Sequence, residues 1–370
     1  MERLTLATAA IGCGLSQADG LARVSADTAT MAALQGELSE RCSPTATLLG
    51  HILHPVDEWR LRTRSLQFKS GLIMGIVNLT DDSFSGDGVG QGVRAALARA
   101  EALRNAGADT IDVGAETARA DRPVLNAATE AKVVGEVVAA LSREGHCVSC
   151  DTYKPEVVRA ALEAGAELVN DISGLTLGLG AAEEAARANT GYVLNYSYSV
   201  PKRRPDSPPD YEDVVATTVA WMFERVATLE GCGLSREAIA IDPGIAFGKS
   251  HDEDIQVIRR IGELRTLGLP VLLAHSRKNF IGSVSGRAPA DRDLETHIAT
   301  AMAFAQGARI FRVHDVAGTR RALDIAEALA TRSAGAFAPD AESWPWRAGA
   351  SAAHMTGADP DKAAPTGQRW

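Results

Sequence analysis

The chain of 370 residues can hold one large domain with extensions, and its 45% hydrophobic content is ordinary for an α/β protein. A net charge of −9 argues against a nucleic-acid partner, because phosphate-binding surfaces need an excess of Lys and Arg. The five cysteines, an odd number, favour a reducing compartment over a disulfide framework. No apolar run approaches the roughly 20 residues that span a bilayer. We therefore expect a cytoplasmic protein with no membrane or nucleic-acid partner.

In chain order, residues 1–65 carry a helical pattern at 28–39 but no recognisable chemistry, and we interpret them as an N-terminal extension of unknown role. From 66 to 332, short apolar runs alternate with Ala-rich segments of helical period. The apolar runs have the length and composition of buried parallel strands and lie at 72–78, 109–113, 147–151, 167–170, 191–196, 238–242, 270–275 and 308–313. The helical segments between them include 93–107, 128–142, 154–165, 211–231, 254–267 and 294–307. Residues 333–370 are rich in Ala, Gly, Pro and Asp, which predicts a disordered tail.

Eight strand–helix units of even spacing predict an α/β fold, a (β/α)8 TIM barrel, with a doubly wound open sheet as the competing architecture. Asp or Asn recurs where the predicted strands end, at Asn78, Asp112, Asp151, Asn170–Asp171 and Asp242. Barrel enzymes carry their active sites at the C-terminal ends of the strands, so the chemistry is expected there. A helix N-cap or a loop brace is the alternative interpretation of any one of these residues.

Two cationic side chains follow the eighth predicted strand. Arg312 and His314 flank Val313, so in an extended chain they point the same way. Barrels often bind phosphate after their last strands. The pair therefore predicts an anion site, although a single histidine taken alone is more often structural.

Cys147 and Cys150 have the spacing of a CxxC motif. Residues three apart on a strand face opposite sides, which favours core packing over a redox or zinc role.

A series of polar segments follows the predicted strands, in order along the chain. The segments are MGIVNLTDDSFS from 74, DVGAETAR from 112, DTYK from 151, NDISG from 170, DPGIAFGK from 242, SRK from 276 and RVHD from 312. Taken together, over about 72 to 332, the series resembles the dihydropteroate synthase family.

The resemblance implies a transferase of folate biosynthesis that joins 6-hydroxymethyl-7,8-dihydropterin diphosphate to p-aminobenzoate and releases diphosphate. It implies a pterin site made of Asp151, Asn170, Asp242, Phe247 and Lys278. It implies a diphosphate site made of Asn78, Arg119, Arg312 and His314, with Asn78 also holding Mg2+. The arylamine would contact Ala118, Arg119, Ser276, Arg277 and Lys278, and the catalytic residues would be Lys278, Arg312, His314 and Asp151. Family members are commonly homodimers through their later helices, which implies a homodimer here.

The chain departs from the family's pattern mainly in its loops. Asp81 replaces the usual proline of the first loop, and Ala118 and Ala120 replace the Thr and Pro that border p-aminobenzoate. The segment 195–198, NYSY, takes the place of a methionine-histidine-methionine segment, and His275, either a ring at the edge of the site or a packed strand-end histidine, precedes the SRK triplet. The pterin and diphosphate half is thus intact, while the arylamine half is rewritten.

Three functions are compatible with this pattern. The first, which we favour, is synthesis of dihydropteroate with an altered fit for p-aminobenzoate. The second is condensation of the same pterin with a different arylamine, as methanopterin-type pathways require. The third is pterin binding without turnover.

Overall fold

A computed structural model of the chain describes residues 14–18, 21–25, 28–40, 44–79, 92–116, 124–199, 201 and 209–331. The expected tail, 333–370, lies outside the described residues. The strands and the site described below belong to one compact unit, Met1–Glu327.

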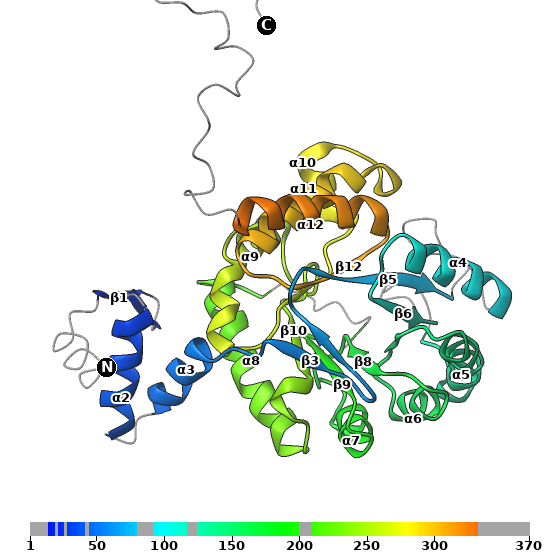
Figure 1. Cartoon of the computed structure of the whole chain (residues 1–370), viewed down its shortest axis with the longest axis horizontal. Coiled ribbons are helices and arrows are strands. Elements are labelled where there is room, and N and C mark those ends of the chain that lie inside the picture. The colour runs from blue at the N-terminus through cyan, green and yellow to red at the C-terminus, as the bar shows by residue number, and fades with distance from the viewer. Residues whose placement is uncertain are drawn as a thin grey trace, which may run out of the picture. The chain divides into compact units, whose positions relative to one another are not determined.

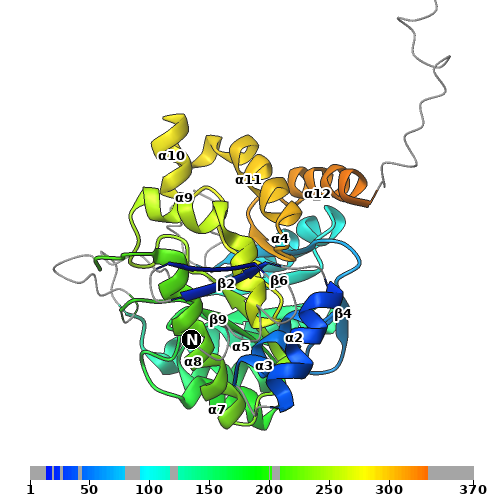
Figure 2. The same ribbon diagram turned by 90° about the vertical axis from the view of Figure 1, so that its left-hand side faces the viewer.

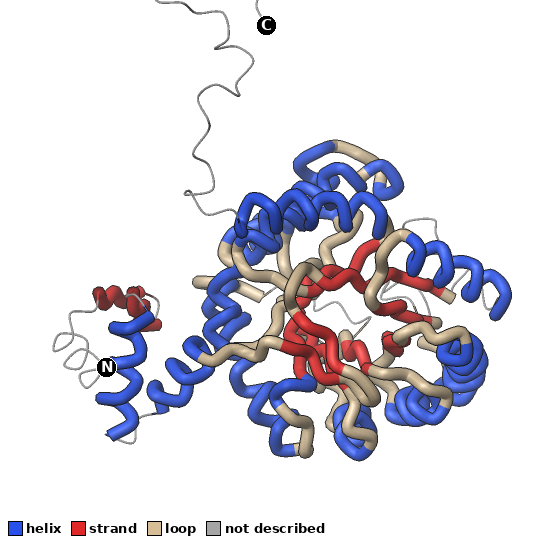
Figure 3. Tube along the Cα trace, viewed as in Figure 1, coloured by secondary structure: helices blue, strands red, loops and turns tan. Residues whose placement is uncertain are grey.

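Eight parallel strands form the inner layer of this unit (Figure 3). They are β5 (Leu72–Asn78), β6 (Thr110–Gly114), β7 (Val148–Asp151), β8 (Leu168–Asp171), β9 (Gly191–Asn195), β10 (Ile239–Asp242), β11 (Leu272–Leu273) and β12 (Ile310–Val313). Each strand pairs with its neighbour in the order β10-β9-β8-β7-β6-β5-β12-β11. A bridge between Ile241 and Val271, with a 3.0 Å hydrogen bond from Ile241 N to Pro270 O, joins β10 to β11. The sheet is therefore closed, which confirms the barrel and excludes the open sheet.

Helices follow the strands and surround them (Figure 1). They are α4 (Val93–Asn105), α5 (Ala127–Arg143), α6 (Pro155–Glu163), α7 (Gly180–Arg187), α8 (Val214–Gly231), α9 (His251–Arg259), α10 (Asn279–Ser285), α11 (Asp293–Ala305) and α12 (Val316–Thr331). In two views at right angles, α9, α10 and α11 lie side by side (Figure 2). No described helix has both the length and the apolar character that crossing a bilayer requires.

The segment expected as one helix at 254–267 is divided in two. Helix α9 ends at Arg259, and a 3-10 helix, η2 (Ile261–Leu267), follows. Between them Arg260 leaves helical geometry, with φ −117° and ψ 19°. Its guanidinium donates two hydrogen bonds of 2.9 and 2.8 Å to Asp213, the N-cap of α8, and this long-range ion pair accompanies the break.

The strands place their side chains on alternate sides. The inward side chains form one buried cluster, and its members on strands are Leu72, Met74, Leu168, Val193, Ala240, Leu272 and Ile310. Outward side chains of the same strands, such as Ile73, Val169 and Leu194, belong to a second cluster together with the helices. This alternation fixes which residues can reach the inside of the barrel.

A short hairpin closes the N-terminal end of the barrel. Its strands are β3 (Glu58–Arg60) and β4 (Ser65–Gln67). Trp59 is fully buried in the inward cluster, and its Nε1 donates a 2.9 Å hydrogen bond to the carbonyl of Ala238, just before β10. The hairpin overlaps the segment 1–65, so the end of that segment has a role in closing the barrel. The rest of its described part forms β1 (Gly14–Ala18), β2 (Leu21–Ser25), α2 (Thr28–Glu40) and α3 (Pro44–Leu53), and α2 matches the helix expected at 28–39.

We expect Trp59→Ala to lower the free energy of unfolding by roughly 3–5 kcal/mol, because it leaves a cavity at the end of the barrel. Urea unfolding followed by circular dichroism measures this loss. Trp59→Phe keeps most of the buried volume and removes the bond to Ala238, so it should cost less. Equal stability of Trp59→Ala and wild type would contradict the proposed role of the hairpin.

Candidate active site

Polar side chains gather where the strands end, at the mouth of the barrel opposite the hairpin. The register pairs Asp112 with Ile76, Asp151 with Asn170, and Asn195 with Asp242. Each of these residues continues the inward alternation of its strand. The inward polar residues at the mouth are Asn78, Asp112, Asp151, Asn170, Asn195, Asp242, Ser276, Arg312 and His314. Most of the predicted site residues therefore converge.

Arg312 reaches from β12 to two carboxylates on neighbouring strands. Its Nε lies 2.6 Å from Asp112 Oδ2, and its Nη2 lies 2.8 Å from Asp151 Oδ2. Burial alone would lower the pKa of Arg312, but the two carboxylates hold that pKa above its usual value. The guanidinium is thus a fixed positive charge at the mouth of the barrel.

Asp112 is a site residue to which the sequence analysis gave no role. Its Oδ2 accepts from Arg312 and, at 3.1 Å, from Asn170 Nδ2, while its Oδ1 is buried without a hydrogen-bond partner among the described residues. Asp112 points inward, because it is in register with Ile76, which lies between Met74 and Asn78 on β5. This inward position is the signal that could have identified it. Asn195, noted only as a departure from the family, has the same inward position beside Asp242.

Asp151 has an electrostatic environment that favours its protonated form. Burial raises its pKa, the Arg312 guanidinium lowers it and the like charge of Asp112 raises it, and the net result is a pKa of about 7. Burial therefore outweighs the ion pair with Arg312 in setting the direction of the pKa shift of Asp151.

Asp242 and Lys278 form a second pair of opposite charges at the mouth. Asp242 is buried, and its Oδ1 accepts a 2.8 Å bond from the backbone N of Gly244, whose φ is +67°. A Cβ at Gly244 would clash with the carbonyl of Tyr196, so the turn needs glycine. Lys278 Nζ donates to the carbonyl of Ile245 at 2.7 Å.

Each charge of this pair partly offsets the effect of burial on the pKa of the other residue. Burial raises the pKa of Asp242 and lowers that of Lys278, and in each case the opposite charge of the other residue works against burial. Phe247 borders the pair, with its ring centroid 5.2 Å from Lys278 Nζ.

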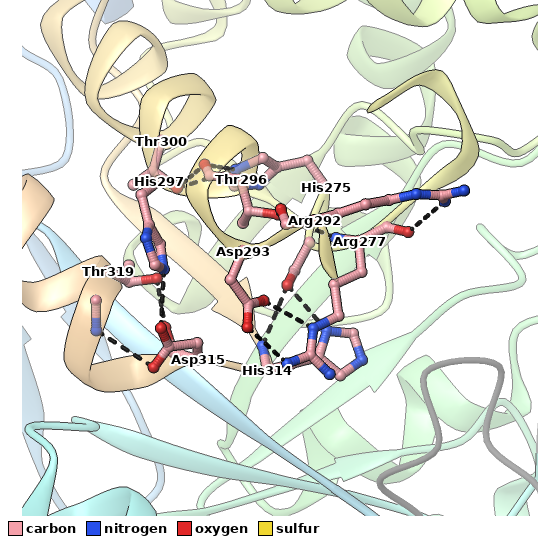
Figure 4. Close-up of polar contacts among 12 residues, drawn as sticks. His275, Arg277, Arg292, Asp293, Thr296, His297, Thr300, His314, Asp315 and Thr319 are labelled. Carbon is pink, nitrogen blue, oxygen red and sulfur yellow. Dashed lines mark hydrogen bonds and ion pairs between the residues drawn. The ribbon is translucent and has the colours of Figure 1, made fainter. Parts of the chain in front are cut away.

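The SRK segment also lies close to His314, which follows β12 (Figure 4). Ser276 Oγ lies 2.9 Å from His314 Nδ1 and accepts a 3.2 Å bond from the His314 backbone N. Arg277 donates to Asp293 from Nε at 2.7 Å and from Nη2 at 2.8 Å.

His275 faces the helices rather than the site. Its ring is fully buried, with Nε2 2.9 Å from Thr300 Oγ1, and burial lowers its pKa to about 4. Of the two interpretations of His275, a ring at the edge of the site or a packed strand-end histidine, the structure shows the second.

The CxxC spacing carries no joint chemistry in this fold. Cys147 belongs to the inward cluster and Cys150 to the outward cluster, and both are free and buried. Burial raises the pKa of Cys147 to about 12. The two thiols point to opposite sides of the sheet, as the strand geometry predicted.

Two of the predicted arylamine and diphosphate residues, Ala118 and Arg119, lie outside the described residues. Asn78 is half-buried at the end of β5, in register with Gly114. Among the described residues, no three His, Cys, Asp or Glu side chains are grouped so as to hold a metal ion.

A closed barrel with a polar, charged site at the C-terminal ends of its strands defines an enzyme of the TIM-barrel class. The model of a family described as pterin binding enzyme matches residues 74–314. The dihydropteroate synthase of Escherichia coli K12 is 35% identical over 265 residues, which cover 71% of this chain and 93% of that protein.

Two solved structures agree with this result. The Thermus thermophilus dihydropteroate synthase in complex with 4-aminobenzoate is 35% identical, with a TM-score of 0.66, over 74% of this chain and 99% of that one. The Xanthomonas albilineans enzyme in complex with 7,8-dihydropteroate has the same identity and TM-score over 75% of this chain and 100% of that one. The chain belongs to the pterin-binding enzymes and, among them, to the dihydropteroate synthase family.

We expect Asp112→Asn to lower the pKa of Asp151 by roughly one unit, because it removes a like charge and keeps an oxygen that accepts from Arg312. Carbon-13 NMR of the Asp151 carboxyl group as a function of pH measures this change. Asp109→Asn is the matched control, since Asp109 pairs with Arg320 at the other end of β6. An unchanged pKa in Asp112→Asn would contradict the assigned coupling.

Proposed function

We propose that the protein is a dihydropteroate synthase that condenses 6-hydroxymethyl-7,8-dihydropterin diphosphate with p-aminobenzoate. The observation that carries this proposal is the convergence of Asp151, Asn170, Asp242 and Lys278 with Arg312 at the mouth of the barrel. Family membership supports the same reaction.

The pterin would be recognised along the polar edges of its ring. Its amidine edge carries adjacent N–H donors, and a carboxylate such as Asp242 can accept two of them. Asn170 offers both a donor and an acceptor, and Lys278 can donate to the ring oxygen and nitrogen. Phe247, which borders Lys278, would pack against the ring. These groups are fixed on strand ends or tied to the backbone, which supports a preorganised pterin site.

The reaction replaces one bond to the pterin CH₂ group by another. The C–O bond to the diphosphate breaks, and the electron pair leaves with the diphosphate. The nitrogen of the arylamine forms the new C–N bond and then gives up a proton to water. Arg312 and His314 would stabilise the negative charge of the leaving group, and positioning with electrostatic stabilisation would supply the catalysis.

Asn78 is the residue that would hold Mg2+. An amide oxygen suits this role, because Mg2+ commonly takes one or two protein oxygens and completes its coordination with phosphate oxygens and water. When bound, the ion neutralises charge on the diphosphate. We also propose a cytoplasmic location, on the basis of the free thiols at Cys147 and Cys150.

The function is tested by measuring diphosphate release from the purified protein with dihydropterin diphosphate, Mg2+ and p-aminobenzoate. We expect release that depends on p-aminobenzoate and yields dihydropteroate. Tight pterin binding without this release would contradict the proposal and favour a different arylamine or a binding role.

Asp242→Asn should weaken pterin binding at least several-fold, because a charge-assisted hydrogen bond contributes about 1.5–3 kcal/mol.

We propose that the protein is a homodimer that associates through α11. Leu294, Ile298 and Met302 lie four residues apart on this helix and are 65, 53 and 58% exposed. Residues four apart share one helix face, so the three form an apolar stripe. A second copy of the chain would cover this stripe, because members of the family are commonly homodimers that associate through their later helices.

Sedimentation velocity tests this association. We expect a dimer for the wild-type protein and a shift toward monomer for Ile298→Glu, because a charge in an apolar contact must lose its water. Phe223→Glu on α8 is the matched control, since Phe223 is also a large exposed apolar residue. A wild-type monomer, or an equal effect of both substitutions, would contradict this interface.

A further inference from the structure

We propose that Asp293 of α11 is a positioning residue that fixes the segment 276–278 through its ion pair with Arg277. The proposal rests on the proposed synthase reaction, in which Ser276 and Lys278 face the substrates. It assigns a role to a residue outside the mouth of the barrel, on the helix behind the SRK segment.

The backbone of Arg277 is in a conformation that L residues seldom adopt. Its φ is +60°, in the left-handed region, where a side chain with a Cβ is strained. Such a conformation persists only where surrounding contacts hold it. It turns the chain between Ser276, which bonds to His314, and Lys278, which lies beside Phe247.

The first turn of α11 and the residue before it supply those contacts (Figure 4). The backbone N of Arg277 donates to Thr296 Oγ1 at 3.2 Å. The buried guanidinium of Arg292 donates to the carbonyl of Arg277 at 2.9 Å and to that of Lys278 at 3.2 Å. Asp293 binds the guanidinium of Arg277 at two points. Backbone and side chain of Arg277 are thus both held from α11.

The ion pair also defines what Arg277 does. Its Nε and Nη2 form the side of the guanidinium that best fits a carboxylate, and Asp293 occupies that side. Arg277 therefore acts on the arylamine mainly by placing its two neighbours. The Arg277 and Asp293 side chains are only 14% and 30% exposed, so the pair is partly shielded from water and from competing ions.

Steady-state kinetics of dihydropteroate formation test the role of Asp293. We expect Asp293→Asn to raise KM for p-aminobenzoate roughly tenfold and to change kcat less than about threefold, because it loosens a binding segment without removing a reacting group. Asp293→Glu keeps the charge and should restore most of the affinity. A general loss of structure would lower kcat in both variants and would not show this rescue.

Two further variants keep the test decisive. Thr296→Val removes the acceptor of the Arg277 backbone N–H at nearly constant volume, so it should also raise KM for p-aminobenzoate. This variant provides the test if Asp293→Asn fails to fold. Glu295→Gln is the matched control. Glu295 lies on the same turn of α11 as Asp293, but its carboxylate pairs with Arg287 rather than with Arg277. Normal turnover with unchanged KM in Asp293→Asn would overturn the positioning role. Absence of dihydropteroate formation by the wild-type protein would instead overturn the proposed function.

Discussion

The alternation of side chains along closed parallel strands is the constraint on which the rest of the structure depends. Because every second residue points inward, the register decides which side chains at the end of each strand lie at the mouth. Asp151 and Asn170 meet in this way although they come from different strand–helix units. A shift of one residue in any strand would turn its polar side chain toward the helices and its apolar neighbour into the site.

The charges collected by this constraint must then stabilise one another. Asp112, Asp151 and Asp242 would be costly to bury alone, and Arg312 and Lys278 lie among them. The compensation is incomplete, since burial still raises the pKa values of Asp151 and Asp242. An excess of acceptors at the mouth suits a ligand rich in N–H donors, so the imbalance itself is consistent with a pterin site.

Sequence reasoning predicted the barrel and the converging strand ends because both follow from local periodicity. It did not assign a role to Asp112, whose main partner, Arg312, lies 200 residues away along the chain. The division of the segment 254–267 has the same origin, because the ion pair between Arg260 and Asp213 depends on how two helices pack. Likewise, the triplet SRK predicted Arg277 as a site residue, but its ion pair with Asp293 on α11 depends on the packing of the helix layer.

The two halves of the site differ in the kind of structure that supports them. Asp151, Asn170 and Asp242 belong to strands, whose positions are fixed by the barrel, whereas the proposed arylamine half would depend on loops and on the segment 276–278. Loops accept substitution more readily than a closed sheet does, which fits the departures at Asp81, Ala118 and Ala120, whereas Asn195 is a departure at the end of a strand. In the proposed site, the placement of Ser276 and Lys278 rests on the contacts of Arg277 between them. In this chain those contacts come from α11, the same helix that carries the apolar stripe proposed to bind a second subunit, so association and arylamine binding would share one element.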